Sequence, residues 1–309
     1  ADREIVLAAV TANGLALQYA DESLKADREI VLVAIEIDES ALQYADESLK
    51  ADREMVLDAI KKSDKKNEKR SHLLSYVDAK FNTDREVILA AIQSESFSVN
   101  DALKFADKSL KSDRQVILAA IHSKSLWCYS ACEVLEYADE SIKADREVVL
   151  AAVKQEWPAL QHADDELKAD REIVLAAVTA NGLALQFTDK SLKADREIVL
   201  AAVTLEGYAL EYADKSFRAD REIVLAAVTA NGNALQFADK SFKADREIVL
   251  AAVTANGNVL KYADKSLKAD REIVHAAVTL EGYALESADK SFRDDREIVL
   301  AAVKTYGRF

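Results

Sequence analysis

Residues 169–193 read ADREIVLAAVTANGLALQFTDKSLK, and variants of this 25-residue stretch fill almost the whole chain. Its first 18 letters recur unchanged at residues 1–18. Each unit starts with an Asp-Arg pair, and these pairs begin at Asp2, Asp27, Asp52, Asp84, Asp113, Asp145, Asp170, Asp195, Asp220, Asp245, Asp270 and Asp295. The spacing is 25 residues, except between Asp52 and Asp145, where it is 32, 29 and 32. The 309 residues therefore hold eleven complete repeats and a twelfth that stops at Phe309.

Each unit is predicted to form two short helices. Asp170 is placed to cap the first helix, and Glu172 puts a negative charge beside the dipole in its first turn. The apolar run IVLAAV continues this helix to Thr179, and we expect Asn181-Gly182 to end it in a left-handed conformation. LALQF then forms the second helix, and one more turn leads to the next unit.

The first helix carries six consecutive apolar residues, which cover nearly every direction around its axis. A single unit cannot bury such a helix alone, so neighbouring units must stack on it. With helices about 8–10 Å apart, the array would be roughly 100 Å long. The sequence predicts an all-α fold, a single elongated and curved solenoid over residues 1–309. Only 7 Gly and 1 Pro are present, which argues against sheet-rich folds.

Three irregular insertions interrupt the array, at residues 61–83, 93–100 and 122–134. Both ends of the sequence are consensus repeats, whereas solenoid ends normally carry polar capping repeats. Either neighbouring chains cover these ends or the sequence is a segment of a longer array, and we favour the longer array.

The chain is acidic, with 41 basic and 55 acidic residues and a formal net charge of −14. A surface of this charge repels phosphate backbones, which argues against general nucleic-acid binding. No apolar run approaches the roughly 20 residues that cross a bilayer. Two cysteines cannot form a secreted-type disulfide framework. We expect a soluble protein of the cytoplasm or an organelle interior, or one on the surface of a membrane complex.

The repeat resembles the domain of unknown function 4116 family, short tandem helical repeats of algae, other protists and some bacteria. The resemblance rests on D-R-E-(I/V)-V-L-A-A-V, then N-G, then A-L-(Q/E)-(Y/F)-A-D-x-S-(L/F)-K, and it covers nearly the whole chain. It implies a helical repeat architecture and brings no assigned activity.

Residues 61–70, KKSDKKNEKR, form a basic segment in an acidic protein. It could contact an acidic partner or an anionic membrane surface, and the alternative is an ordinary solvated loop. Its candidate binding residues are Lys61, Lys62, Lys65, Lys66, Lys69 and Arg70.

Aromatic residues gather in the second long insertion, where residues 125–132 read SLWCYSAC. Trp127 and Tyr129 lie there, and Trp157 follows one repeat later. Such residues are frequent in binding hot spots, but they also fill irregular cores, and both interpretations are open.

No catalytic, cofactor-binding or metal-binding residue is predicted. Cys128 and Cys132 form a C-x3-C pair with His122 and His162 nearby, a weak metal signal because structural zinc sites favour tighter pairs and four ligands. His72 lies in the basic insertion. His275 replaces a repeat Leu, and we expect it to be partly exposed or hydrogen-bonded. The Asp-Arg-Glu triplets are too numerous to be active sites and are predicted to cap helices and to pair between repeats.

Substitutions between repeats concentrate at the turn between the two helices, hereafter the inter-helix turn. It reads ANGL at residues 12–15, LEGY at 205–208 and ANGN at 230–233, and Tyr208 and Tyr283 are candidate contacts there. The prediction is a non-enzymatic protein–protein interaction scaffold, in the form of a structural or linker subunit of a larger assembly. The alternatives are a free adaptor for a transient partner and a membrane-surface tether through residues 61–70.

Overall fold

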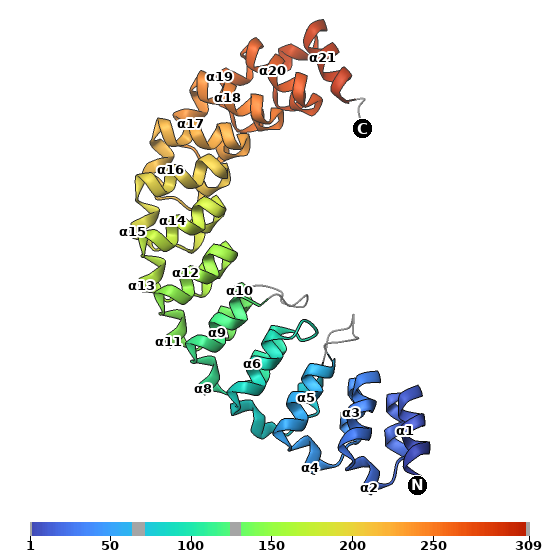
Figure 1. The fold of residues 1–309 in the computed structure, drawn as a ribbon. Helices are drawn as coiled ribbons and strands as arrows, with labels where there is room; N and C mark the ends of the chain where they lie inside the picture. The colour runs from blue at the N-terminus through green and yellow to red at the C-terminus, as the bar shows by residue number, and fades with distance from the viewer. Residues whose placement is uncertain (1, 64–71, 124–130, 307–309) are drawn as a thin grey trace. The chain divides into compact units, whose positions relative to one another are not determined.

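The computed structural model describes residues 2–63, 72–123 and 131–306 (Figure 1). These residues form helices and no strand, so the predicted all-α repeat architecture is confirmed. The chain divides into two compact units, Ala1–Asp164 (unit 1) and Asp165–Phe309 (unit 2). Within each unit successive repeats lie side by side in chain order (Figure 1). A single array over residues 1–309 stays a prediction.

Unit 1 is made of α-helices (α) and 3₁₀ helices (η) in regular succession. They are α1 (Arg3–Ala12), η1 (Gly14–Tyr19), α2 (Glu22–Lys25), α3 (Arg28–Ile37), η2 (Glu39–Tyr44), α4 (Glu47–Lys50), α5 (Arg53–Ser63), η3 (Leu73–Ser75), η4 (Ala79–Thr83), α6 (Arg85–Gln93), α7 (Val99–Phe105), α8 (Lys108–Lys111), α9 (Arg114–Ile121), α10 (Ala131–Tyr137), α11 (Glu140–Lys143), α12 (Arg146–Gln155) and η5 (Trp157–His162).

Unit 2 continues the same order without long insertions. Its elements are α13 (Asp165–Lys168), α14 (Arg171–Ala180), η6 (Gly182–Phe187), α15 (Lys190–Lys193), α16 (Arg196–Leu205), η7 (Gly207–Glu211), η8 (Lys215–Ala219), α17 (Arg221–Ala230), η9 (Gly232–Gln236), η10 (Phe242–Ala244), α18 (Arg246–Ala255), η11 (Gly257–Tyr262), α19 (Lys265–Lys268), α20 (Arg271–Leu280), η12 (Gly282–Ser287), η13 (Lys290–Arg293) and α21 (Arg296–Tyr306).

The regular repeat has the predicted order of two helices and one more turn, but its second helix is a 3₁₀ helix. In the repeat that starts at Asp170, the ten-residue α14 is followed by the 3₁₀ helix η6 and the single turn α15. A 3₁₀ helix rises about 2.0 Å per residue against 1.5 Å for an α-helix, so six residues return along most of the length of α14. The second segment is an α-helix, as predicted, in the longer repeats that contain α7 and α10.

The predicted left-handed end of the first helix is wrong. Asn181 is extended, with φ −158° and ψ 122°, and no described residue has a positive φ. The Asn181 N–H donates to the carbonyl of Ala177, which ends α14, and its side-chain oxygen accepts the N–H of Leu183, which starts η6. One extended Asn therefore caps two consecutive helices.

Glycine follows this Asn because the next repeat packs against it. A Cβ on Gly182 would lie 2.1 Å from the carbonyl oxygen of Ala202 in α16, closer than any real contact. The same approach recurs at all six described glycines, and at Gly14 the distance to the oxygen of Ala34 is 2.4 Å. The glycine is thus set by contact between repeats and not by its backbone conformation.

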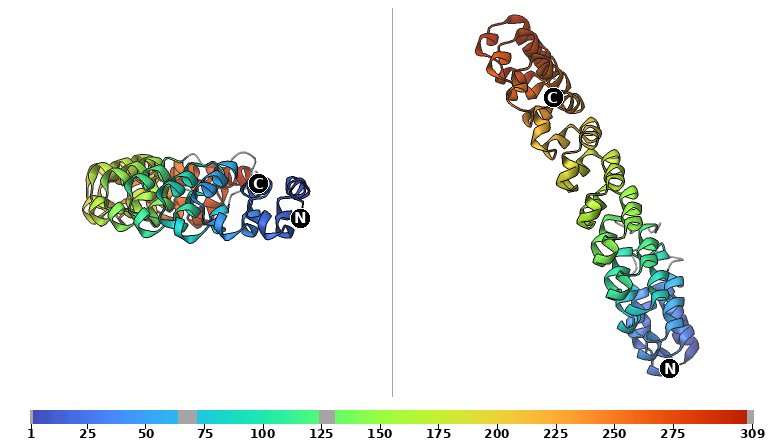
Figure 2. Two further views of the ribbon diagram at one scale, coloured as in Figure 1. Left: turned by 60° about the horizontal axis from the view of Figure 1, so that its bottom comes forward. Right: turned by 90° about the vertical axis from the view of Figure 1, so that its left-hand side faces the viewer.

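The core of each repeat comes from one side of the first helix together with buried residues of the second segment, such as Ala209 and Leu210 in η7. In α16 the side chains of Ile198, Val199, Ala202 and Val203 are fully buried, whereas Leu200 is half-buried. Within unit 2 each long helix packs on the next, as α16 does on α17, and the 3₁₀ helices form a second row, as η6 does on η7 (Figure 2). This arrangement leaves the inter-helix turns along one edge of each unit.

Candidate interaction surface

The repeated Asp-Arg-Glu triplet forms an ion-pair ladder between consecutive repeats. Arg246 Nε lies 3.0 Å from Asp270 Oδ2, and the same guanidinium pairs with Glu272. The other oxygen of Asp270 accepts the backbone N–H groups of Glu272 and Ile273 at 3.0 and 3.2 Å. Asp270 therefore caps its own helix and binds the Arg of the preceding repeat, and Asp27, Asp84 and Asp113 do the same in unit 1, which assigns the triplet to structure.

The ladder also sets the ionisation of its carboxylates. The hydrogen bond from Arg3 holds the pKa of Asp27 below its ordinary value, against a smaller opposing effect of burial. The backbone N–H groups of Ile30 and Glu29 act in the same direction. Asp27 therefore keeps its negative charge to a lower pH than an ordinary aspartate.

Only part of the basic segment lies among the described residues. Lys61 is exposed at the end of α5, while Lys62 Nζ forms an ion pair with Glu36 Oε2 of the preceding repeat at 3.2 Å. The other four predicted contacts, Lys65, Lys66, Lys69 and Arg70, lie outside the described residues. Of the two placed lysines, one is thus already engaged within unit 1.

The insertion at 93–100 is packed into unit 1. Phe97 is 1% exposed, and the serines on either side of it, Ser96 and Ser98, are also buried. Asn100 occupies the position of the repeat glycine and donates a hydrogen bond to Glu133 of the next repeat. This insertion therefore has a structural role in the described chain.

The aromatic candidates separate into described and undescribed residues. Trp127 and Tyr129 lie outside the described residues. Trp157 starts η5 and is partly exposed, and Pro158 follows in the first turn, where its missing N–H is not needed. The carboxylate of Glu156, just before it, accepts the backbone N–H of Cys132 at 3.4 Å.

Neither the cysteine nor the histidines form a reactive cluster in the described chain. Burial raises the pKa of Cys132, whose sulfur accepts a hydrogen bond from Gln161 at 2.9 Å. Cys128 lies outside the described residues. Across residues 2–63, 72–123 and 131–306, no three His, Cys, Asp or Glu side chains are grouped to hold a metal ion.

The histidines have separate polar neighbours. His122 Nδ1 lies 3.2 Å from the side-chain nitrogen of Gln155, and His72 Nδ1 lies 3.9 Å from Asp101 Oδ2. His275 is partly exposed, as predicted, with Nε2 3.9 Å from Glu297 Oε1. His162, the last residue of η5, is partly exposed.

The inter-helix turns of unit 2 expose large apolar side chains. Leu205 is 53% exposed and Leu280 is 50% exposed. Tyr208 packs edge-on against the ring of Phe237, with centroids 6.0 Å apart, while Tyr283 is half exposed. Variation between repeats predicts both tyrosines as contacts. It does not predict Leu280, which the exact return of TLEGYALE at residues 279–286 could have indicated.

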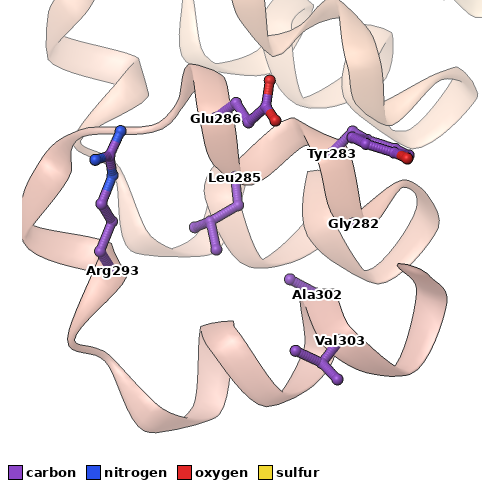
Figure 3. Close-up of a pocket in the computed structure, with 7 residues that line it drawn as sticks. All are labelled: Gly282, Tyr283, Leu285, Glu286, Arg293, Ala302 and Val303. Carbon is purple, nitrogen blue, oxygen red and sulfur yellow. The ribbon is translucent and has the colours of Figure 1, made fainter. Parts of the chain in front are cut away.

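Tyr283 also borders a hollow of about 380 Å³ between η12, η13 and α21 (Figure 3). Leu285 and Val303 form its apolar wall, and Glu286 and Arg293 stand at its margin. Val303 is 62% exposed, whereas Val278, the equivalent residue one repeat earlier, is fully buried beneath its neighbours.

The family model described as Domain of unknown function (DUF4116) matches residues 2–50, 27–81, 84–133, 128–168, 170–218, 220–268 and 270–309. The chain belongs to this family. The matches to DUF4116 extend through both units and include the longer repeats, so the resemblance seen in the repeat motif is confirmed. No curated protein and no solved structure matches the chain. No helix among the described residues of this DUF4116 protein is long and apolar enough to span a membrane.

Proposed function

We propose that this DUF4116 protein is a non-enzymatic scaffold that binds other proteins along its inter-helix turns. The support comes from a contrast between positions of the repeat. The buried residues of the long helices and the Asp-Arg-Glu ladder hardly change, while the turns carry different side chains, Leu205 and Leu280 among them, at half exposure. Exposed apolar side chains on a regular framework are suited to partner contact.

In its more specific form, the proposal makes the protein a structural or linker subunit of a larger assembly. Such a subunit co-purifies with its partners in fixed proportion, whereas a free adaptor runs as a single chain. The test is gentle isolation from the native source, followed by measurement of the particle mass and of the co-eluting chains. A stoichiometric complex supports a subunit, and a particle with the mass of one native chain contradicts it and favours the adaptor.

We propose as a second candidate function that the basic segment attaches the protein to a membrane surface. The exposure of Lys61 supports this proposal. Binding to anionic vesicles should weaken sharply as salt screens the lysines. Neutral substitutions of all six basic residues between Lys61 and Arg70 should remove this binding. Vesicle binding that survives these substitutions would exclude the segment as the tether.

A further inference from the structure

Two repeats of unit 2 depart from their neighbours at the same place. Residues 205–208 and 280–283 read LEGY, while the two repeats between them read ANGN at residues 230–233 and 255–258. The LEGY turns thus stand on either side of two ANGN turns along one edge of unit 2.

The LEGY turns lack a hydrogen bond that the ANGN turns have. Asn231 accepts the N–H of Asn233 at 3.0 Å and so caps η9, and Asn256 caps η11 in the same way. Glu206 and Glu281 make no capping bond to η7 and η12. Replacing Ala by Leu at the preceding position also exposes apolar surface. The missing cap is unfavourable for the isolated fold, and together with the exposed leucine it favours a role in contact with a partner.

A polar hollow of about 510 Å³ lies between the LEGY turns. It is lined by Asn231, Asn233, Asn256 and Asn258 of the two ANGN turns and reaches Glu281. The capping bonds use only the side-chain oxygens of Asn231 and Asn256, so their NH₂ groups stay available as donors. Among the described residues, neither Glu206 nor Glu281 forms an ion pair with a basic side chain.

We propose that this edge of unit 2 binds an extended peptide segment with a basic and an apolar residue near each of its two ends. The basic residues would meet Glu206 and Glu281, the apolar ones Leu205 and Leu280, and the asparagines the peptide backbone between them. A helical partner satisfies its backbone groups internally and would leave the amides unused, so an extended segment fits better. This inference rests on the proposed interaction function and names the partner's chemistry.

The dimensions of the edge define the length of the peptide. Helices stack about 8–10 Å apart, so the two LEGY turns, three repeats apart, lie roughly 24–30 Å from each other. An extended chain covers about 3.3 Å per residue, and the two anchor pairs should therefore be about eight residues apart.

The probe is a displayed library of random peptides of about 14 residues, selected on the 309-residue protein. The counter-target carries Leu205→Ala, Glu206→Asn, Leu280→Ala and Glu281→Asn, which restore the Ala-Asn pair of the neighbouring repeats. This matched variant should keep the fold, because its turn residues already stand at 230–231 and 255–256. Circular dichroism checks that it does.

We expect selected peptides to carry the two basic–apolar anchors and to bind the variant at least about tenfold more weakly. Peptides that bind both proteins equally, that are acidic, or that carry a single anchor would overturn the inference, as would a selection without enrichment. None of these results removes the proposed scaffold function, which depends on the native complex. A monomeric native particle would contradict the subunit proposal and leave the peptide result standing.

Discussion

At the scale of single residues, the repeat glycine is fixed by its neighbour and not by its own backbone. A Cβ on Gly232 would lie 2.3 Å from the carbonyl oxygen of Ala252, and the obstacle is backbone that cannot turn aside. At a site with open space, Gly→Ala stabilises by about 0.4–1 kcal/mol. We predict the opposite sign here, with Gly232→Ala lowering the free energy of unfolding by about 1–3 kcal/mol in urea titrations.

A substitution at the next residue controls for a general effect of placing Ala in this turn. Asn233→Ala removes a partly exposed side chain and should change stability by no more than about 0.5 kcal/mol. A Gly232→Ala protein at least as stable as the parent would show that the contact between repeats is not the reason for the glycine.

The capping aspartates lead to a prediction about pH. The pKa of Asp27 is lowered by Arg3. Burial acts to raise the pKa values of Asp84, Asp113 and Asp270, but their Arg and backbone donors outweigh it and lower them. A lowered pKa stabilises the fold above the ordinary value of 3.8, and this stabilisation is lost as pH falls through the lowered value. The urea concentration at the midpoint of unfolding should therefore decrease as the pH is lowered below about 4.

The measurement is the urea midpoint from about pH 6 to pH 2.5, with Asp27→Asn as the control. The Asn keeps an oxygen for the cap but cannot titrate, so the variant should lose less stability on acidification. A midpoint that stays constant through this range would contradict the contribution of these carboxylates.

At the scale of elements, the ladder ties consecutive long helices together through exposed groups. Arg246 is half exposed while paired with Asp270 and Glu272, and exposed ion pairs of this kind stabilise a fold only weakly. Arg246→Gln should thus lower the urea midpoint slightly at low salt, and by less in 1 M NaCl. Arg296 holds the same position in α21 without an ion-pair partner among the described residues, so Arg296→Gln is the matched control. Equal losses of stability in the two variants would show that the aliphatic part of the arginine side chain, and not its ion pairs, causes the effect.

The missing side-chain cap of η7 should make the LEGY turn at residues 205–208 less stable than an ANGN turn. Glu206→Asn gives η7 the side-chain cap that η9 has, and it should raise the free energy of unfolding by about 0.5–1 kcal/mol. The reciprocal Asn231→Glu should lower it by a similar amount. Urea titration of both variants checks the sign, and a Glu206→Asn protein that is less stable than the parent would show that Glu206 supports the fold itself.

Much of each element could be predicted from the sequence because it depends on local patterns. Asp170 as N-cap and the apolar run after it place α14 within one residue of its observed end at Ala180. The 3₁₀ character of η6 and the reason for Gly182 could not be found in this way. The 3₁₀ rise depends on the length of α14 along which η6 returns, and the glycine depends on the position of the Ala202 carbonyl in the next repeat. For the candidate interaction surface, the variable turns could be predicted from the sequence, but the exposure of Leu280 could not.

At the scale of the whole molecule, the repeat should behave as a removable part. Deleting residues 220–244 joins Ala219 to Asp245, so the sequence across the junction is again ADREIVLAAV. Arg196 would meet Asp245 and Glu247 in place of Asp220 and Glu222, and Gly207 would again face an alanine carbonyl, that of Ala252. Because the repeat after the deletion offers the same partners as the one removed, the shortened protein should fold with unchanged helicity per residue and a slightly lower urea midpoint.

Deleting only residues 220–231 removes α17 and leaves η7 to η9 without a long helix between them. That variant should lose cooperative unfolding, as followed by circular dichroism in urea. Equal damage from both deletions would mean that stability depends on the whole length of the chain and not on packing between neighbouring repeats.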